Sequence, residues 1–112
     1  MAIPHAKPAE LVDVSALGSN LASAQTTTLV KTDSLEVIRL VLPAGKALKP
    51  HEVPGEITVQ CLEGKVAFCA GDSECELTTG KLIYLAGSDE HSLRAVEDSS
   101  LLVTILLKRD VD

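Results

Sequence analysis

Short runs of apolar and β-branched residues, separated by turn residues, dominate the chain from Thr26 onward. Such intervals are typical of an all-β sandwich or barrel. No segment keeps a helical period for more than about two turns. The pattern predicts strands at Thr27–Lys31, Leu35–Leu42, Ala47–Val53, Ile57–Leu62, Lys65–Ala70, Ser73–Thr78, Lys81–Leu85, His91–Ala95 and Leu101–Leu107.

The start of the chain is less regular than the rest. Pro4, Pro8 and Gly18 interrupt residues 1–24, and the run from Pro8 to Asp13 suits either a short helix or an added edge strand. A length of 112 residues fits one domain. We therefore expect an irregular N-terminal segment over residues 1–24 and one barrel over residues 25–112.

Two strands carry more apolar residues than one face of a small barrel requires. Leu101–Leu107 is nearly all apolar, which predicts burial on both faces, and Val37–Leu42 is similar. Large exposed apolar patches mark interfaces. The sequence therefore predicts a homodimer.

Composition restricts the partners further. The formal net charge is −6, whereas binding to a phosphate backbone depends on Lys and Arg. Aromatic residues make up only 2% of the chain, too few for a platform on which bases stack. No glycine-rich loop suited to phosphates is present, so we expect neither a nucleic-acid partner nor a nucleotide cofactor.

The chain also lacks the usual signals for a membrane or for export. No apolar run approaches the roughly 20 residues that span a bilayer. The first residues contain no continuous apolar core of a signal peptide. We expect a cytoplasmic protein without a membrane partner.

The three cysteines, Cys61, Cys69 and Cys75, are an odd number in a chain without an export signal, which predicts free thiols. One alternative stays open. A three-residue loop over residues 71–73 would place Cys69 opposite Cys75, at a Cα separation of roughly 4.5–5.5 Å that a disulfide can bridge.

Two histidines occupy the two halves of a glycine-punctuated pattern. Gly45 precedes His51 by six positions and Gly64 closes that half; Gly80 opens the second half, which ends at His91. This spacing resembles the two motifs of a small single-domain cupin, over about Leu35 to Leu107. The resemblance implies a double-stranded β-helix, or jelly-roll, barrel. In cupins, two His and a carboxylate from the first motif and one His from the second hold a divalent metal.

Only part of this ligand set is present. His51 and His91 match, but Val53 stands where the second His belongs and Ile57 stands at the carboxylate position. Glu56 comes one residue too early. The resemblance implies at most a weak site for Zn, Fe, Mn or Ni, held by His51 and His91, with Glu56 as a candidate third ligand.

Strand alternation decides which side chains face the cavity. Along residues 57–62, Ile57, Val59 and Cys61 form an apolar face, which a barrel interior normally takes. Glu56 and Gln60 then point outward, unless a β-bulge at Pro54-Gly55 shifts the register by one. The candidate cavity residues besides the metal ligands are Val53, Ile57, Gln60 and Tyr84.

Two functions remain open at this stage. One is a binding module whose aliphatic cavity holds a small molecule. The other is a metal-dependent cupin enzyme, of the oxygenase or isomerase type, that uses His51 and His91. No catalytic residue is assigned, because no serine lies in a glycine elbow and no Cys stands next to a His.

Overall fold

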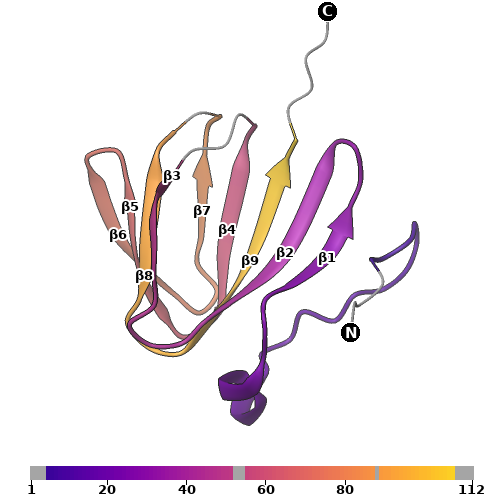
Figure 1. The fold of residues 1–112 in the computed structure, drawn as a ribbon, viewed down its shortest axis with the longest axis horizontal. Helices are drawn as coiled ribbons and strands as arrows, with labels where there is room; N and C mark the ends of the chain where they lie inside the picture. Colours follow the sequence, from indigo (N-terminus) through magenta and orange to yellow (C-terminus); the bar gives the residue numbers. More distant parts are fainter. Residues whose placement is uncertain (1–4, 52–54, 88, 108–112) are drawn as a thin grey trace, which may run out of the picture.

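The computed structural model describes residues 5–51, 55–87 and 89–107, and these residues fold into two antiparallel sheets. Figure 1 shows the sheets curving toward each other and joined at the lower end of the view. One sheet has five strands in the order β1-β2-β9-β4-β7, and the other has four in the order β3-β8-β5-β6. The strands are β1 Thr27–Lys31, β2 Leu35–Leu42, β3 Ala47–His51, β4 Ile57–Glu63, β5 Lys65–Ala70, β6 Ser73–Thr78, β7 Leu82–Leu85, β8 His91–Ala95 and β9 Ser99–Leu106.

This architecture confirms the predicted all-β jelly roll. Five strands have the predicted bounds, namely those at 27–31, 35–42, 65–70, 73–78 and 91–95. The others differ by one or two residues at an end. The described part of the predicted strand Ala47–Val53 ends at His51, because residues 52–54 lie outside the described residues.

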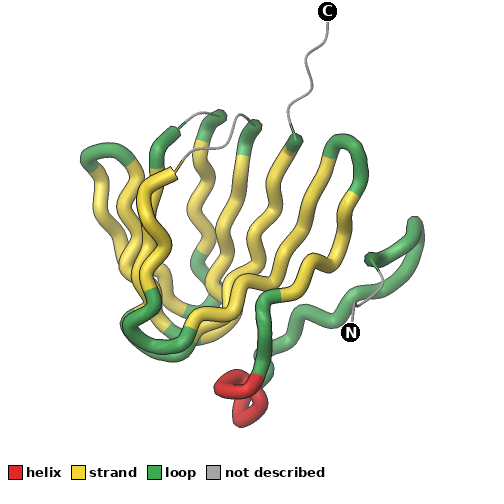
Figure 2. The backbone as a smooth tube through the Cα atoms, in the orientation of Figure 1, coloured by secondary structure: helices red, strands yellow, loops and turns green. Residues whose placement is uncertain are grey.

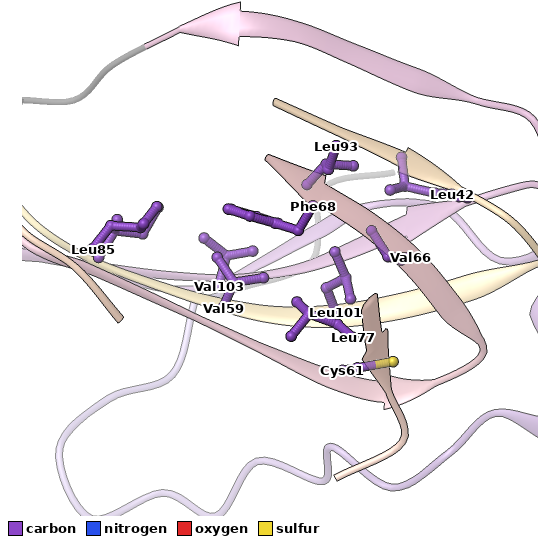
Figure 3. Packing of buried hydrophobic residues seen from close by; sticks show 12 residues of the cluster. Leu42, Val59, Cys61, Val66, Phe68, Leu77, Leu85, Leu93, Leu101 and Val103 are labelled. Carbon is purple, nitrogen blue, oxygen red and sulfur yellow. The ribbon is translucent and has the colours of Figure 1, made fainter. Parts of the chain in front are cut away.

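The core lies between the two sheets and is almost entirely aliphatic. On β4 and β9 the inward residues face each other in register, with Val59 opposite Val103 and Cys61 opposite Leu101. Phe68, on β5, contributes the core's aromatic ring and is 1% exposed. Figure 3 shows Val59, Leu101 and Val103 pointing toward Val66, Phe68 and Leu93 of the other sheet. Burying each large side chain of this kind stabilises the fold by about 1.5–3 kcal/mol.

Gly64, which closes the first half of the glycine pattern, allows the chain to pass from β4 to β5. Its φ is +97°, a conformation that other residues rarely adopt. A Cβ at this position would overlap the Ser99 hydroxyl and the carbonyl oxygen of Asp98. The Lys65 N–H donates to Ser99 Oγ at 3.0 Å, so the close approach also fixes the start of β5.

The N-terminal segment runs beside β1 and contains a 3₁₀ helix, η1, over Gly18–Ser23 (Figure 2). Residues 8–13 form neither the helix nor the edge strand that we considered. Near the start, the Ala6 N–H donates to the carbonyl oxygen of Leu29 in β1 at 2.8 Å. Among the described residues, no helix is long and apolar enough to cross a membrane.

Two charged side chains of the five-stranded sheet hold this segment. Arg39 in β2 is 6% exposed and donates to the carbonyl oxygens of Ser15 and Asp13, at 3.0 and 3.4 Å. Glu63 in β4 accepts hydrogen bonds from the Leu17 and Gly18 N–H groups, at 2.9 and 3.1 Å. We call Arg39 and Glu63 the clamp.

The hairpin between β5 and β6 differs from the geometry that a disulfide would need. Ala70 pairs with Ser73, so the loop has two residues and Cys69 lies opposite Glu74, while Cys75 lies opposite Phe68. The one-residue shift places Cys69 and Cys75 on opposite faces of the hairpin. All three cysteines are free. Burial raises the pKa of the Cys61 thiol, which is enclosed by the core.

Candidate functional site

A cavity of about 150 Å³ lies between the sheets. Its described lining comes from five strands, three in the five-stranded sheet and two in the other. Every lining residue other than His91 is Leu, Ile or Val. The lining consists of Ile38 and Leu40 of β2, Leu48 of β3, Ile57 and Val59 of β4, His91 and Leu93 of β8, and Val103 and Ile105 of β9.

Among the described lining residues, His91 is the polar one, and its ring is held in place. It is 4% exposed, and its ring stacks on Phe68 with the ring centroids 5.8 Å apart and the planes 7° from parallel. Nδ1 lies 3.2 Å from the carbonyl oxygen of Asp89. Because a carbonyl only accepts, the proton of this hydrogen bond belongs on Nδ1. The ring therefore presents a fixed orientation to the cavity.

His51 lies opposite His91 in the backbone register. β3 and β8 pair with His51 across from His91, after an irregularity between Leu48 and His51. The two halves of the glycine pattern thus meet at one point of the four-stranded sheet. The side chain of His51 and the whole of Val53 lie outside the described residues, so the structure does not place these two predicted site residues further.

Ile57, which stands at the carboxylate position of the cupin pattern, points into the barrel. It is buried and lines the cavity together with Val59. The pairing of β4 with β9 is regular from Ile57 to Cys61 and shifts only between Cys61 and Glu63. Alternation therefore holds across the part of β4 that matters for the site.

The same register corrects the positions of three candidate residues. Glu56, Gln60 and Tyr84 were assigned to the metal site or the cavity, and all three instead belong to the outer face. Tyr84 is 55% exposed, and its hydroxyl donates to the exposed carboxylate of Glu56. Gln60 pairs with the exposed Leu82. The physical reason is that Ile57 and Val59 point inward, so Gln60 alternates to the outer face, and Tyr84 shares that face because it pairs with Thr58.

Tyr84 and Glu56 form a small polar pair on this outer face. The hydrogen bond to the Glu56 carboxylate raises the pKa of the Tyr84 phenol, because ionising the phenol would place two negative charges side by side. The pair is solvent-exposed and belongs to the surface of the sheet. It does not contribute to the cavity chemistry.

The described donor atoms do not fit a complete metal site. Among the residues that the structure describes, no group of three His, Cys, Asp or Glu side chains is placed to hold a metal ion. Catalytic zinc usually has three protein ligands. With Ile57 inward and Glu56 outward, the carboxylate of the cupin set has no counterpart among the described residues.

Much of the described lining was not singled out from the sequence. Ile38, Leu40, Leu93, Val103 and Ile105 belong to the cavity, and the signal for them was present as alternation in their strands. Arg39 and Glu63 were also missed. A charged residue between apolar neighbours, as Arg39 is in β2, was the available signal for a buried polar anchor.

Comparison with solved structures supports the fold. The sequence matches no family model and no curated protein. An RmlC-like cupin from Desulfovibrio desulfuricans is 24% identical, with a TM-score of 0.66 over 91% of this chain and 97% of that one. A Streptococcus pyogenes protein of unknown function is 21% identical, with a TM-score of 0.75 over 98% and 97% of the two chains. A predicted oxalate decarboxylase from Thermotoga maritima is 20% identical, with a TM-score of 0.67 over 74% and 79%.

These likenesses, together with the two facing sheets, give the chain the fold of a small cupin domain. At such identities they show the fold alone. The function has to be argued from the cavity, because one barrel fold hosts many unrelated functions.

Proposed function

We propose that this protein is a binding module whose barrel cavity holds a small molecule without metal chemistry. The observation that carries the proposal is the described cavity lining, in which His91 stands among Leu, Ile and Val side chains. Ligand pockets are mostly apolar with a few placed polar groups, and this cavity has that character. Ile57 adds to it by filling the carboxylate position with a branched hydrocarbon.

Metal binding at this site is weak in our proposal. In this proposal His51 and His91 are the two surviving ligands, and Glu56, which bonds Tyr84 on the outer face, does not join them. Imidazole suits Zn²⁺, Fe²⁺, Mn²⁺ and Ni²⁺ alike, so two of them select poorly among these ions. Purified protein should therefore hold less than one metal per chain, and the affinity should fall as the pH drops through the histidine range.

The second candidate is a metal-dependent cupin enzyme of the oxygenase or isomerase type. The observation that favours it is the pairing of His51 with His91 across β3 and β8. In that case the two imidazoles would hold the metal, which would supply Lewis-acid or redox chemistry. The described residues do not complete such a site, so we rank this candidate second.

Metal analysis separates the two candidates. We would measure metal per chain before and after dialysis against a chelator for the wild type, His51→Ala and His91→Ala. His5→Ala is the matched control, because His5 is exposed and distant from the pattern in sequence. We expect substoichiometric metal that the chelator removes from the wild type and from His5→Ala. One chelator-resistant metal per chain, lost in both His51→Ala and His91→Ala, would refute the binding module and favour the enzyme.

A further inference from the structure

The volume and the aliphatic lining of the cavity restrict which class of ligand it can hold. Its volume of about 150 Å³ is that of an apolar cavity known to accept benzene or xenon. A buried water needs about 2–4 polar partners, and aliphatic side chains offer none. The cavity is therefore suited to a molecule that also needs few polar partners.

We infer that the ligand is an uncharged, mainly hydrocarbon molecule of about the size of benzene, with at most one polar group. The inference rests on the proposed binding function and deepens it. It names a small aromatic ring or a short branched alkyl group as the part that enters the barrel.

Polar and anionic ligands fit this lining poorly. A carboxylate loses its hydration on entry and usually needs two or three hydrogen-bond donors in return. The described lining offers the imidazole of His91 and otherwise hydrocarbon. A sugar carries several hydroxyl groups, each of which would be left without a partner against Ile57, Val59 or Val103.

The position of His91 also favours a flat or compact ligand. Its ring stacks on Phe68 and its Nδ1 is engaged by the Asp89 carbonyl oxygen, so the ring does not need to reorient when a ligand enters. Because this ring is already ordered, ligand binding has no further entropy cost for fixing it, and the rigid wall selects ligands by their shape. The surrounding methyl groups come from both sheets, which lets a small ring make contacts on both of its faces.

The test is a methyl NMR titration of the full chain with three probes: benzene, benzoate and xylose. Benzene and benzoate share the ring and differ in charge, while xylose is uncharged and rich in hydroxyl groups. Benzene should shift the methyl resonances of the lining residues and saturate at millimolar concentration. Benzoate and xylose should leave these resonances unchanged.

Two neighbouring residues of β2 provide a matched pair of variants. Ile38 lines the cavity, while Val37 alternates to the opposite face of the sheet. Ile38→Phe should fill the cavity and remove the benzene shifts, and Val37→Phe should retain them. Leu48→Phe, on β3, serves the same purpose if Ile38→Phe does not fold.

The outcomes separate the two proposals. Saturable binding of benzoate or xylose, lost in Ile38→Phe, would overturn the hydrocarbon ligand and leave the binding module standing. No shift of lining methyls with any probe would overturn the ligand class. A chelator-resistant metal in the wild type would overturn the binding module, and with it the hydrocarbon ligand that rests on it. Benzene shifts that persist in both Ile38→Phe and Leu48→Phe would place the benzene elsewhere and also overturn the inference.

Discussion

Two hollows of this protein differ in their polar lining: the cavity inside the barrel, and a groove beneath the N-terminal segment. The cavity is lined by hydrocarbon with His91 as its described polar residue, whereas the groove, of about 400 Å³, has the buried Arg39 in its wall. The Arg39 guanidinium donates hydrogen bonds to backbone carbonyl oxygens of the N-terminal segment. The comparison teaches that the buried charge here holds a segment of the chain itself, while the apolar interior is the part that we propose as the ligand site.

The largest expected effect on stability comes from a substitution in the core inside the barrel. Phe68→Ala should lower the free energy of unfolding by about 3–5 kcal/mol, because Phe68 is fully enclosed and the cavity it leaves cannot collapse completely. Urea denaturation measures the change. Tyr84→Ala on the exposed outer face is the control and should change stability little. Equal losses for both variants would contradict the assignment of inner and outer faces.

A smaller loss is expected when the clamp is broken. Arg39→Met keeps the apolar stem but removes the hydrogen bonds to Ser15 and Asp13, which should cost about 2 kcal/mol. It should also speed proteolysis within residues 5–24, which cleavage mapping by mass spectrometry would locate. Arg94→Met is the control, since Arg94 is exposed on β8. Unchanged cleavage in Arg39→Met would show that the clamp does not hold the segment.

The clamp also predicts a pH dependence. Burial opposes ionisation of Glu63, but hydrogen bonds from Leu17, Ser100 and Gly18, with the charge of Arg39, outweigh it and hold the pKa of Glu63 below its usual value. A group whose pKa is lowered by folding adds stability above its unfolded pKa and loses it as the pH falls through the folded value. The stability difference between wild type and Glu63→Gln should therefore be present at neutral pH and shrink in acid. A constant difference from neutral pH down to pH values below that pKa would contradict this account.

The smallest effect on folding concerns the outer face. On the five-stranded sheet, Leu82 and Tyr84 of β7 each expose 55% of their surface and Leu106 of β9 exposes 47%. The last residues of β9 therefore lack, within one chain, the burial on both faces that the sequence predicts. We propose that a second copy covers this face as a homodimer. Light scattering at micromolar concentration should give a dimer for the wild type and a monomer for Leu82→Lys, with similar unfolding. A wild-type monomer would contradict the proposal.

The sequence was sufficient for the strands because turn residues and alternation are local signals. Alternation also placed Ile57, Val59 and Cys61 inward, as the structure has them. The predicted bounds of the β5–β6 hairpin also hold, and its two-residue loop rules out the alternative three-residue loop that would have placed Cys69 opposite Cys75. One residue of loop length is a difference that the residues 71–73 alone do not resolve, because glycine and aspartate suit both turns.

The site was harder to predict than the fold. A motif spacing identifies where His51 and His91 stand along the chain, but ligand geometry depends on register across two sheets. Assigning Glu56 and Gln60 to the site required a one-residue shift, whereas β4 has Ile57 and Val59 inward. Tyr84 was a candidate because its strand leads to His91, but it pairs with Thr58 on the outer face. The attachment of the N-terminal segment likewise depends on contacts between Glu63 and Leu17, which are 46 positions apart and leave no periodic signal.

The contact between Asp89 and His91 has a consequence for changing what the cavity selects. Asp89 is exposed, yet its carbonyl oxygen orients the enclosed ring, and its carboxylate accepts from the Ala86 N–H at 3.0 Å. An exposed residue therefore controls the orientation of a buried ring. Substitutions at Asp89 could therefore change the orientation of the His91 ring in the cavity without changing the aliphatic lining or its packing.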